Sequence, residues 1–390
     1  MLLEKHTFSL KKIVPAKTWI KLLLIWIIVL LFSIWGDILT GEMTYIRALV
    51  IFSILLVTII SAAFGVVKEA DELAHKLGEP YGTLILTLSI VSIEAILISA
   101  VMLGPGEFPT IGKDSIFAVM MIIMNLMIGI SILTGGLKHK EQEYNAQGTM
   151  SYTAMIIMLG GLSMILPNFI KGGGNGMFST TQAVTLSILI IVLYGFFLVF
   201  QTKGYSHLFM QPKKGCIEIP FKDRASLYKD IKNSNPSDRK SEILIRTAIL
   251  LAMILPIVLL SHNMANVIDF GVKAANLPIQ LSGIIIAIIV FTPESITAVK
   301  AALNNEFQRT INLCHGAFVS TVGLTVPAVL IIGLISGKTV LFGLTATEMI
   351  LFFITLLLSL MTFSGKRTTP FTGIMHLVLF VVFILLVFYP

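Results

Sequence analysis

The 390-residue sequence is short of charge, and this shortage excludes most soluble proteins. Only 13% of its residues are charged and 56% are hydrophobic, which leaves too little polar surface to cover a soluble fold of this length. Cysteine is scarce as well, with only two residues. Cys216 and Cys314 lack the spacing of a disulfide framework or a zinc site. The composition therefore indicates an integral membrane protein.

Motifs of common enzymes and nucleotide-binding sites are also missing. The sequence has no HExxH, GxSxG or paired-aspartate motif and no GxxxxGK[ST] loop, which argues against an enzyme and an ATP-driven pump. The net charge of +7 is spread over short loops, so we expect no nucleic-acid partner. We expect no cofactor, and no feature of the sequence sets an oligomeric state.

Long apolar runs fill most of the chain. Runs of about 20 apolar residues cross a bilayer as helices, and eleven of them occur, near residues 20–38, 46–67, 81–103, 115–135, 150–169, 182–202, 243–261, 280–302, 311–335, 345–363 and 371–389. We predict an all-α membrane protein of about eleven transmembrane helices in contact with the lipid bilayer.

The positive charges predict the orientation of these helices. With a cytoplasmic N-terminus, alternating sides leaves all but five of the 28 Lys and Arg residues in the cytoplasm, as the positive-inside rule requires. The five outside are Arg47, Lys113, Lys171, Lys273 and Lys338. We therefore expect a multi-pass protein of the cell membrane with its C-terminus outside.

Two acidic residues occupy comparable positions in the two halves of the chain. Glu94 lies in LSIVSIEAILIS and Glu294 in IIVFTPESITAV, each in the second of five predicted helices. Because five is odd, the two units run in opposite directions through the membrane and form an inverted repeat. The predicted regions are a cytoplasmic N-terminus with an extra helix (1–40), a first five-helix repeat (41–202), a basic cytoplasmic loop (203–242) and a second repeat (243–390).

A carboxylate at the centre of a spanning helix costs roughly 2.5–3.5 kcal/mol on insertion scales and usually marks an ion or proton path. The inverted repeat brings Glu94 and Glu294 to a similar depth, where they would face each other. A carboxylate can hold either a proton or a metal ion. We interpret Glu94 and Glu294 as ion-, metal- and proton-binding groups. The alternative is a protonated pair that only joins helices.

Neighbouring polar groups are candidate ligands. Pro293 lacks an amide hydrogen and frees the carbonyl oxygen of Ile289 beside Glu294. Near Glu94, Ser89 and Ser92 carry hydroxyl groups, although back-bonding to their own helix is the alternative for each. The following helices add Asn125 in the first half and Ser320 in the second.

Three further residues are candidates for gating or pH sensing. His75 lies in the charged segment KEADELAHKLGEP, whose alternative interpretation is a solvated linker, and histidine titrates near neutral pH. Pro327 frees the Gly323 carbonyl in GLTVPAVL and predicts a bend that is either static or a hinge.

Cys314 and His315 are adjacent and point in different directions, so we interpret them as packing residues.

At these residues the sequence resembles the calcium/cation antiporter superfamily, and most closely its bacterial calcium/proton branch, which is also associated with sodium/proton and potassium/proton exchange. The resemblance rests on HKLGEPYGTLILTLSIVSIEAILISA, TPESITAVKAALNNEFQRTINL and GLTVPAVL. It implies two inverted five-helix repeats, Glu94 and Glu294 as ion-binding carboxylates, and supporting roles for Asn125 and Ser320. The chain departs from the Gly-Asn-Ala-x-Glu form of other members, with IVSIE and FTPE instead.

The leading hypothesis is a secondary antiporter that expels Ca²⁺ from the cytoplasm in exchange for protons. Calcium prefers oxygen ligands, which two carboxylates and nearby carbonyls, amides or waters supply. Exchange of Na⁺ or K⁺ for protons at the same site is the alternative. A passive cation channel is a rival from another class, although the sequence lacks a symmetric filter loop.

Overall fold

The computed structural model describes residues 15–40, 43–77, 81–103, 109–171, 176–212 and 236–389. This part of the chain is helical except for turns and one short antiparallel pair of strands, β1 (Gln142–Glu143) and β2 (Arg367–Thr368). The α-helices are α2 (Ala16–Thr40), α3 (Tyr45–Leu77), α4 (Tyr81–Leu103), α5 (Ile111–Met121), α6 (Ile128–His139), α7 (Ala146–Gly160), α8 (Thr180–Val199), α10 (Pro236–Ala274), α11 (Gln280–Leu303), α12 (Phe307–Ser320), α13 (Val326–Ser336), α14 (Ala346–Thr362) and α15 (Pro370–Phe388).

Several of these helices are joined without a break by a π-helical turn, which inserts one extra residue into the helix. The turn η1 (Ile122–Met127) joins α5 to α6, and η6 (Thr321–Thr325) joins α12 to α13. Two further π-turns are η2 (Gly161–Ile165), which the 3₁₀ turn η3 (Leu166–Asn168) follows, and η4 (Phe200–Gly204), which precedes the 3₁₀ turn η5 (Ser206–Phe209). Each predicted apolar run thus falls within a helix or a pair of joined helices.

Length and hydropathy identify the membrane-spanning segments. Within the described residues, nine helices are long and apolar enough to cross a membrane, and Leu88–Leu103 and Ala346–Thr362 are shorter apolar helices. The prediction of a multi-pass all-α membrane protein is confirmed. The count of eleven crossings and the division into four regions stay predictions.

Two helices extend beyond the predicted apolar runs. α3 continues to Leu77 and α10 begins at Pro236, so their ends include charged residues. Arg246 on α10 lies 3.0 Å from Glu69 and 3.3 Å from Glu72 of α3. These ion pairs compensate the charges where the two helices meet, which explains why hydropathy alone placed the end of α3 too early and the start of α10 too late. His75 lies in the last turns of α3, but its side chain is outside the described part of the structure.

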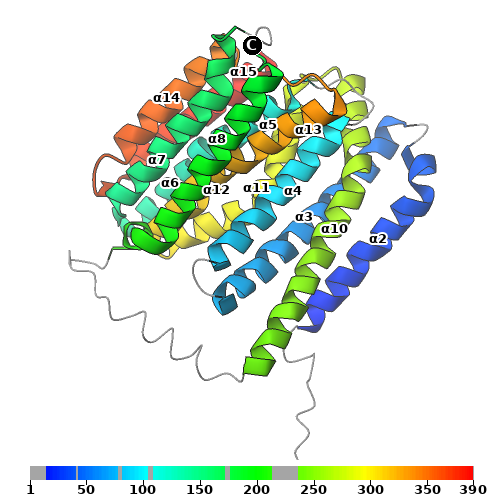
Figure 1. The fold of residues 1–390 in the computed structure, drawn as a ribbon, viewed down its shortest axis with the longest axis horizontal. Coiled ribbons are helices and arrows are strands. Elements are labelled where there is room, and N and C mark those ends of the chain that lie inside the picture. The colour runs from blue at the N-terminus through cyan, green and yellow to red at the C-terminus, as the bar shows by residue number, and fades with distance from the viewer. Residues whose placement is uncertain are drawn as a thin grey trace, which may run out of the picture.

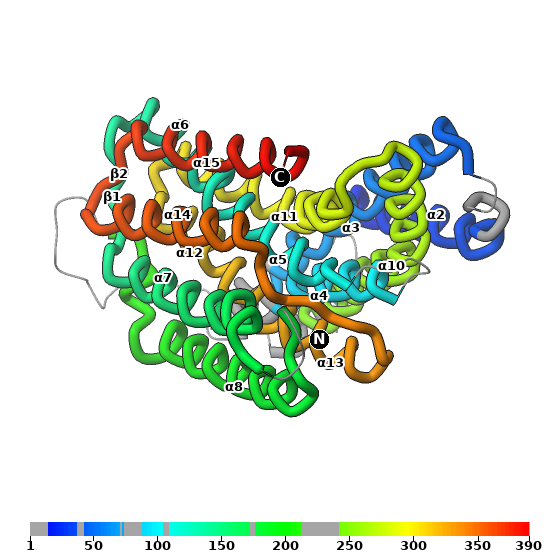
Figure 2. The backbone as a smooth tube through the Cα atoms, turned by 90° about the horizontal axis from the view of Figure 1, so that it is seen from above, coloured from blue at the N-terminus to red at the C-terminus, as the bar shows by residue number. Residues whose placement is uncertain are grey.

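The helices form two groups that meet at α4 and α11. In both views α2, α3 and α10 lie together on one side, whereas α7, α8, α14 and α15 lie on the other (Figures 1 and 2). The contacts are reciprocal, because α4 contacts η6 while α11 contacts η1, and α13 contacts α8 while α6 contacts α15. Two inverted repeats predict reciprocal contacts of this kind, so the contacts agree with the predicted repeat.

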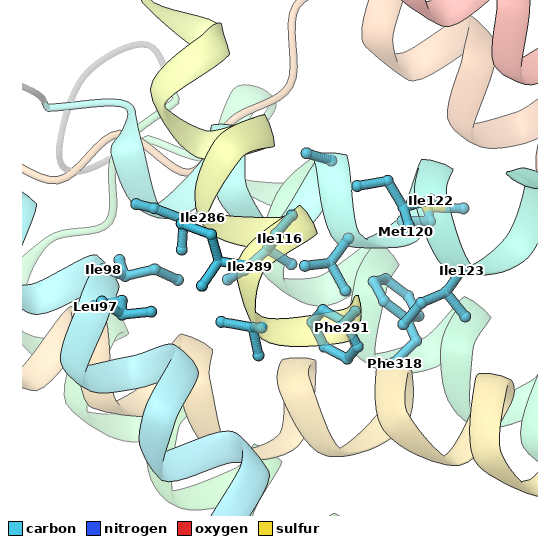
Figure 3. Packing of buried hydrophobic residues seen from close by; sticks show 14 of the residues in the cluster. Leu97, Ile98, Ile116, Met120, Ile122, Ile123, Ile286, Ile289, Phe291 and Phe318 are labelled. Carbon is cyan, nitrogen blue, oxygen red and sulfur yellow. The ribbon is translucent and has the colours of Figure 1, made fainter. Parts of the chain in front are cut away.

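The apolar core fills the space where these central helices cross. Figure 3 shows Leu97 and Ile98 of α4 facing Ile286 and Ile289 of α11, with side chains from α5, η1 and α12 beyond them. Ile98, Ile116 and Ile289 are fully buried. Close packing of this kind transmits small displacements between helices, so the core fixes the positions of the glutamates that lie on α4 and α11.

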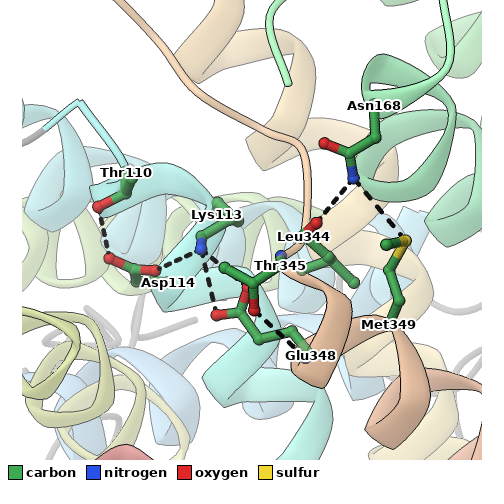
Figure 4. Close-up of polar contacts among 8 residues, drawn as sticks. All are labelled: Thr110, Lys113, Asp114, Asn168, Leu344, Thr345, Glu348 and Met349. Carbon is green, nitrogen blue, oxygen red and sulfur yellow. Dashed lines mark hydrogen bonds and ion pairs between the residues drawn. The ribbon is translucent and has the colours of Figure 1, made fainter. Parts of the chain in front are cut away.

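A buried ion cluster ties the start of α5 to the start of α14 (Figure 4). The Lys113 ammonium lies 2.8 Å from the Glu348 carboxylate and 3.3 Å from that of Asp114. Thr110 donates its hydroxyl to Asp114 at 2.7 Å, and Glu348 also accepts the backbone N–H of Thr345 in a capping box. Buried charges need such partners, and the cluster joins two helices that are far apart in sequence.

Candidate functional site

Glu94 is buried in α4 and receives two hydrogen bonds from the opposite half of the chain. Its side chain has 0% exposure. The hydroxyls of Thr321 and Thr325, both on η6, donate to Oε2 at 2.7 Å and 3.2 Å. Oε1 is buried without a hydrogen-bond partner among the described residues. One oxygen of Glu94 is therefore fixed by two hydrogen bonds from η6.

Glu294 occupies the corresponding place in α11, directly after Pro293 within the helix. Its side chain is 9% exposed, and its Oε2 is buried with no hydrogen-bond partner in the described part of the chain. Glu94 and Glu294 are close enough to interact electrostatically. Two like charges at short range in a low dielectric repel strongly. Ionisation of both carboxylates at once is therefore unfavourable.

The hydroxyl groups that contact Glu94 differ from those that the sequence predicted. Ser320 contacts the hydroxyl of Tyr194 at 2.9 Å and donates to the Gly316 carbonyl at 2.7 Å. Thr321 and Thr325 are the hydroxyl residues that contact Glu94, and a supporting role of Ser320 in ion binding stays a prediction. Thr325 follows Glu294 by 31 positions, as Asn125 follows Glu94, so extending the alignment of the two halves by one helix would have identified it.

The serines of α4 have less direct roles in this structure. Ser92 donates to the Leu88 carbonyl at 2.6 Å, which is back-bonding within its own helix. Ser89 is buried in the same helix. Ile289 is fully buried in α11 one turn before Pro293. Cation ligation by Ser89, Ser92 and the Ile289 carbonyl stays a prediction.

Asn125 lies on η1 and is held by side chains from the last two helices. Its Nδ2 donates to the Thr355 hydroxyl of α14 at 2.9 Å, and its Oδ1 is 3.2 Å from Nδ1 of His376 of α15. His376 is a lone histidine in an apolar run, so the sequence around it shows no partner. A supporting role of Asn125 in ion binding stays a prediction.

The predicted bend in the helix near Gly323 coincides with η6. Gly323 lies within this π-turn, and a Cβ there would approach Cγ of the Tyr194 ring to 2.7 Å. Pro327 occupies the first turn of α13. His315 packs against the ring of Phe363, with 5.2 Å between centroids, and Cys314 is a buried free thiol. Gating at Gly323 and Pro327 stays a prediction.

No group of three His, Cys, Asp or Glu side chains gathers within the described ranges. The hydrogen bonds to the Glu94 carboxylate come from two hydroxyl groups, those of Thr321 and Thr325. Two carboxylates and two threonine hydroxyls provide six oxygen atoms, which suits hard cations better than the soft or borderline transition metals that prefer nitrogen and sulfur.

Comparison with known proteins places this site in a family. The model of the sodium/calcium exchanger protein family matches residues 47–203 and 245–389, which contain both glutamates and both π-turns η1 and η6. The chain belongs to this family. The family match indicates a secondary transporter, and the resemblance to the calcium/cation antiporter superfamily is confirmed.

Individual relatives agree with the exchanger family and differ in their cations. The chain is 33% identical over 333 residues to the sodium-potassium/proton antiporter ChaA of Escherichia coli, covering 85% of this chain and 87% of that protein. It is 22% identical to a Ca²⁺/H⁺ antiporter of Aphanothece halophytica, covering 70% and 72% of the two chains. The solved structure of native YfkE superposes with a TM-score of 0.68 at 18% identity, covering 95% of this chain and all of that one.

Proposed function

We propose that this exchanger exports a cation from the cytoplasm in return for protons, with Ca²⁺ as the leading substrate, and that Glu94 and Glu294 hold the cation and the protons alternately. The observation that carries the proposal is the pair of electrostatically coupled, buried carboxylates, each with an oxygen that lacks a hydrogen-bond partner among the described residues. Such a pair needs a positive charge or a proton. Mutual exclusion of the two at one site is sufficient for coupled exchange.

The proposed exchange cycle consists of cation binding from one side, proton binding from the other, and a change of access between them. From one side of the membrane a cation displaces protons from the carboxylates, and Thr321 and Thr325 turn their hydroxyl lone pairs toward it, because a hydroxyl both donates and accepts. From the other side protons displace the cation. Alternating access exposes the site to one side at a time, and the closely packed α4 and α11 carry both carboxylates through the change together.

Exchange of Na⁺ or K⁺ for protons is the second candidate. It is favoured by the 33% identity to a protein named as a sodium-potassium/proton antiporter, against 22% for one named as a Ca²⁺/H⁺ antiporter. A monovalent cation needs less charge compensation than Ca²⁺, so the presence of two carboxylates does not decide between them. The six oxygens around the glutamates favour Ca²⁺, which takes six to eight oxygen ligands.

Proton flux in inverted membrane vesicles tests the proposal. Ca²⁺, Na⁺ and K⁺ are added separately over a range of pH, and dissipation of an imposed pH gradient by one of them identifies the substrate. We expect Glu94→Gln and Glu294→Gln to abolish the signal, while the matched control Glu306→Gln, whose carboxylate is exposed and pairs with Arg309, keeps it. Full exchange in either site variant would contradict the assignment. Cation flux without proton movement would indicate a channel.

A further inference from the structure

A second buried polar network surrounds Asn125 and joins the first half of the chain to the last two helices. Its members come from three neighbouring segments: Met121 and Asn125 from the α5–η1 helix, Thr355 and Thr362 from α14, and His376 from α15. Asn125, Thr355 and His376 all have 0% exposure. A buried polar group that is not hydrogen-bonded is costly, so the directions of these hydrogen bonds are informative.

With the Asn125 amide oriented as in the structure and a neutral His376 ring, the network has a consistent set of donors and acceptors. The Thr355 hydroxyl donates to Met121 Sδ at 3.6 Å and accepts from Asn125 Nδ2 at 2.9 Å, so the amide oxygen of Asn125 faces His376. An amide oxygen only accepts, and His376 Nδ1 therefore carries the hydrogen of the 3.2 Å contact. In the neutral ring Nε2 then accepts from the Thr362 hydroxyl at 3.1 Å.

A close approach of two helices brings His376 to Asn125. Gly129 of α6 and Gly373 of α15 lie against each other, and a Cβ on Gly373 would be 2.8 Å from the Gly129 carbonyl oxygen. Gly129 is about one turn after Asn125, and Gly373 is about one turn before His376. Without side chains at both positions, the helices come near enough for an imidazole to reach the amide.

The position of Asn125 links this network to the glutamates. Its π-turn η1 contacts α11, the helix of Glu294, just as η6 contacts α4. Asn125 also matches Thr325 in spacing from the glutamate of its own half, and Thr325 donates to Glu94. The equivalent position in the other half is thus a contact of the carboxylate site. The side chain of Asn125 is bound instead by Thr355 of α14 and His376 of α15.

We propose that His376 is a positioning residue that withholds the amide oxygen of Asn125 from the transported cation and thereby lowers cation affinity. The proposal rests on the exchange function proposed above. A cation that takes the Asn125 oxygen as a ligand must compete with the His376 N–H, and a buried hydrogen bond of this kind contributes about 0.5–1.5 kcal/mol. Weaker binding speeds release, which benefits an exchanger that must let its cation go on the far side.

Three variants separate this role from a general loss of structure. His376→Leu removes the donor, whereas His376→Asn keeps an amide N–H at about the place of Nδ1. Met375→Leu changes the adjacent residue, which is 42% exposed and has no hydrogen bond to the network among the described contacts. Initial rates of cation-driven proton flux in inverted vesicles, measured over a range of Ca²⁺, Na⁺ or K⁺ concentrations, give the apparent KM and the maximal rate for each.

We expect His376→Leu to lower the apparent KM by about threefold to tenfold, the equivalent of one such hydrogen bond, and to reduce the maximal rate because release is slower. His376→Asn should restore the KM to within about twofold of the wild type, and Met375→Leu should match the wild type. Thr355→Val removes one of the two acceptors of the amide nitrogen, which lets the amide turn away from His376. It should lower the KM in the same direction, so it serves if His376→Leu does not fold.

An unchanged or raised KM in His376→Leu and Thr355→Val, with the protein folded by size-exclusion chromatography, would overturn the positioning role. A KM in His376→Asn equal to that of His376→Leu would also overturn it, because the donor would then be irrelevant. Failure of the wild type to couple any of the three cations to protons is a different result, which overturns the exchange function and this inference with it.

Discussion

The two π-turns η1 and η6 occupy equivalent places in the two halves and bind different partners. In η6, Thr321 and Thr325 donate directly to Glu94. In η1, the amide of Asn125 is bound by Thr355 and His376. One turn thus hydrogen-bonds to a buried carboxylate, while the other is attached to the last two helices. Both halves have a π-turn at this point, and its side chains contact different partners in each half.

The comparison explains why the repeat is easier to see in the backbone than in the side chains. A π-turn widens the helix by one residue and directs side chains inward at a point where an α-helix would not. This local geometry occurs in both halves. The residue types at the turn differ between the halves. In our proposal one half contacts the carboxylate site and the other lowers the affinity for the cation.

The largest effect is expected from removing the ligands of η6. The double change Thr321→Val and Thr325→Val deletes both hydroxyl donors to Glu94 with little change in shape, and hydrogen bonds to a charged group contribute about 1.5–3 kcal/mol each. We expect the apparent KM for the cation to rise at least tenfold and the maximal rate to fall, because protons then compete more effectively for Glu94. Cation-driven proton flux in inverted vesicles measures both, and Thr372→Val on α15 is the control.

A second change acts on the attachment of η1. Gly373→Val places a side chain against the backbone of α6, where Cβ would lie 2.8 Å from the Gly129 oxygen and 2.9 Å from the Leu133 nitrogen. Overpacking of this kind costs about 1–3 kcal/mol, so we expect a lower Tm for the purified protein. Gly195→Ala, where a Cβ meets nothing within 4 Å, is the matched control. Equal Tm values for the two variants would argue against a close helix contact at Gly373.

The smallest effect is expected at Ser320, which the sequence predicted as a ligand. Its hydroxyl contacts Tyr194 and Gly316 rather than a glutamate. Ser320→Ala should therefore leave cation-driven proton flux within about twofold of the wild type, the range of a single neutral hydrogen bond. A tenfold loss of flux, with normal amounts of folded protein in the membrane, would place Ser320 back in the cation site.

The sequence was sufficient to predict the helical membrane fold and the family, because each spanning run is long and the two acidic residues are rare in such runs. It did not distinguish Ser320 from Thr321 and Thr325. Hydroxyl residues are frequent in these helices, and most bond their own backbone, as Thr58 and Ser163 do. The π-turn also shifts the rotational position of every residue after it, so a straight helical wheel assigns the wrong face.

The central claim is that protons and a cation compete for Glu94 and Glu294. Calorimetric titration of the purified protein with the transported cation, repeated in buffers of different ionisation enthalpy, measures the number of protons released on binding. We predict proton release that accompanies binding, an affinity that falls as pH falls, and loss of the release in the Glu94→Gln, Glu294→Gln double variant. Tight cation binding that releases no protons and does not change with pH would contradict the account.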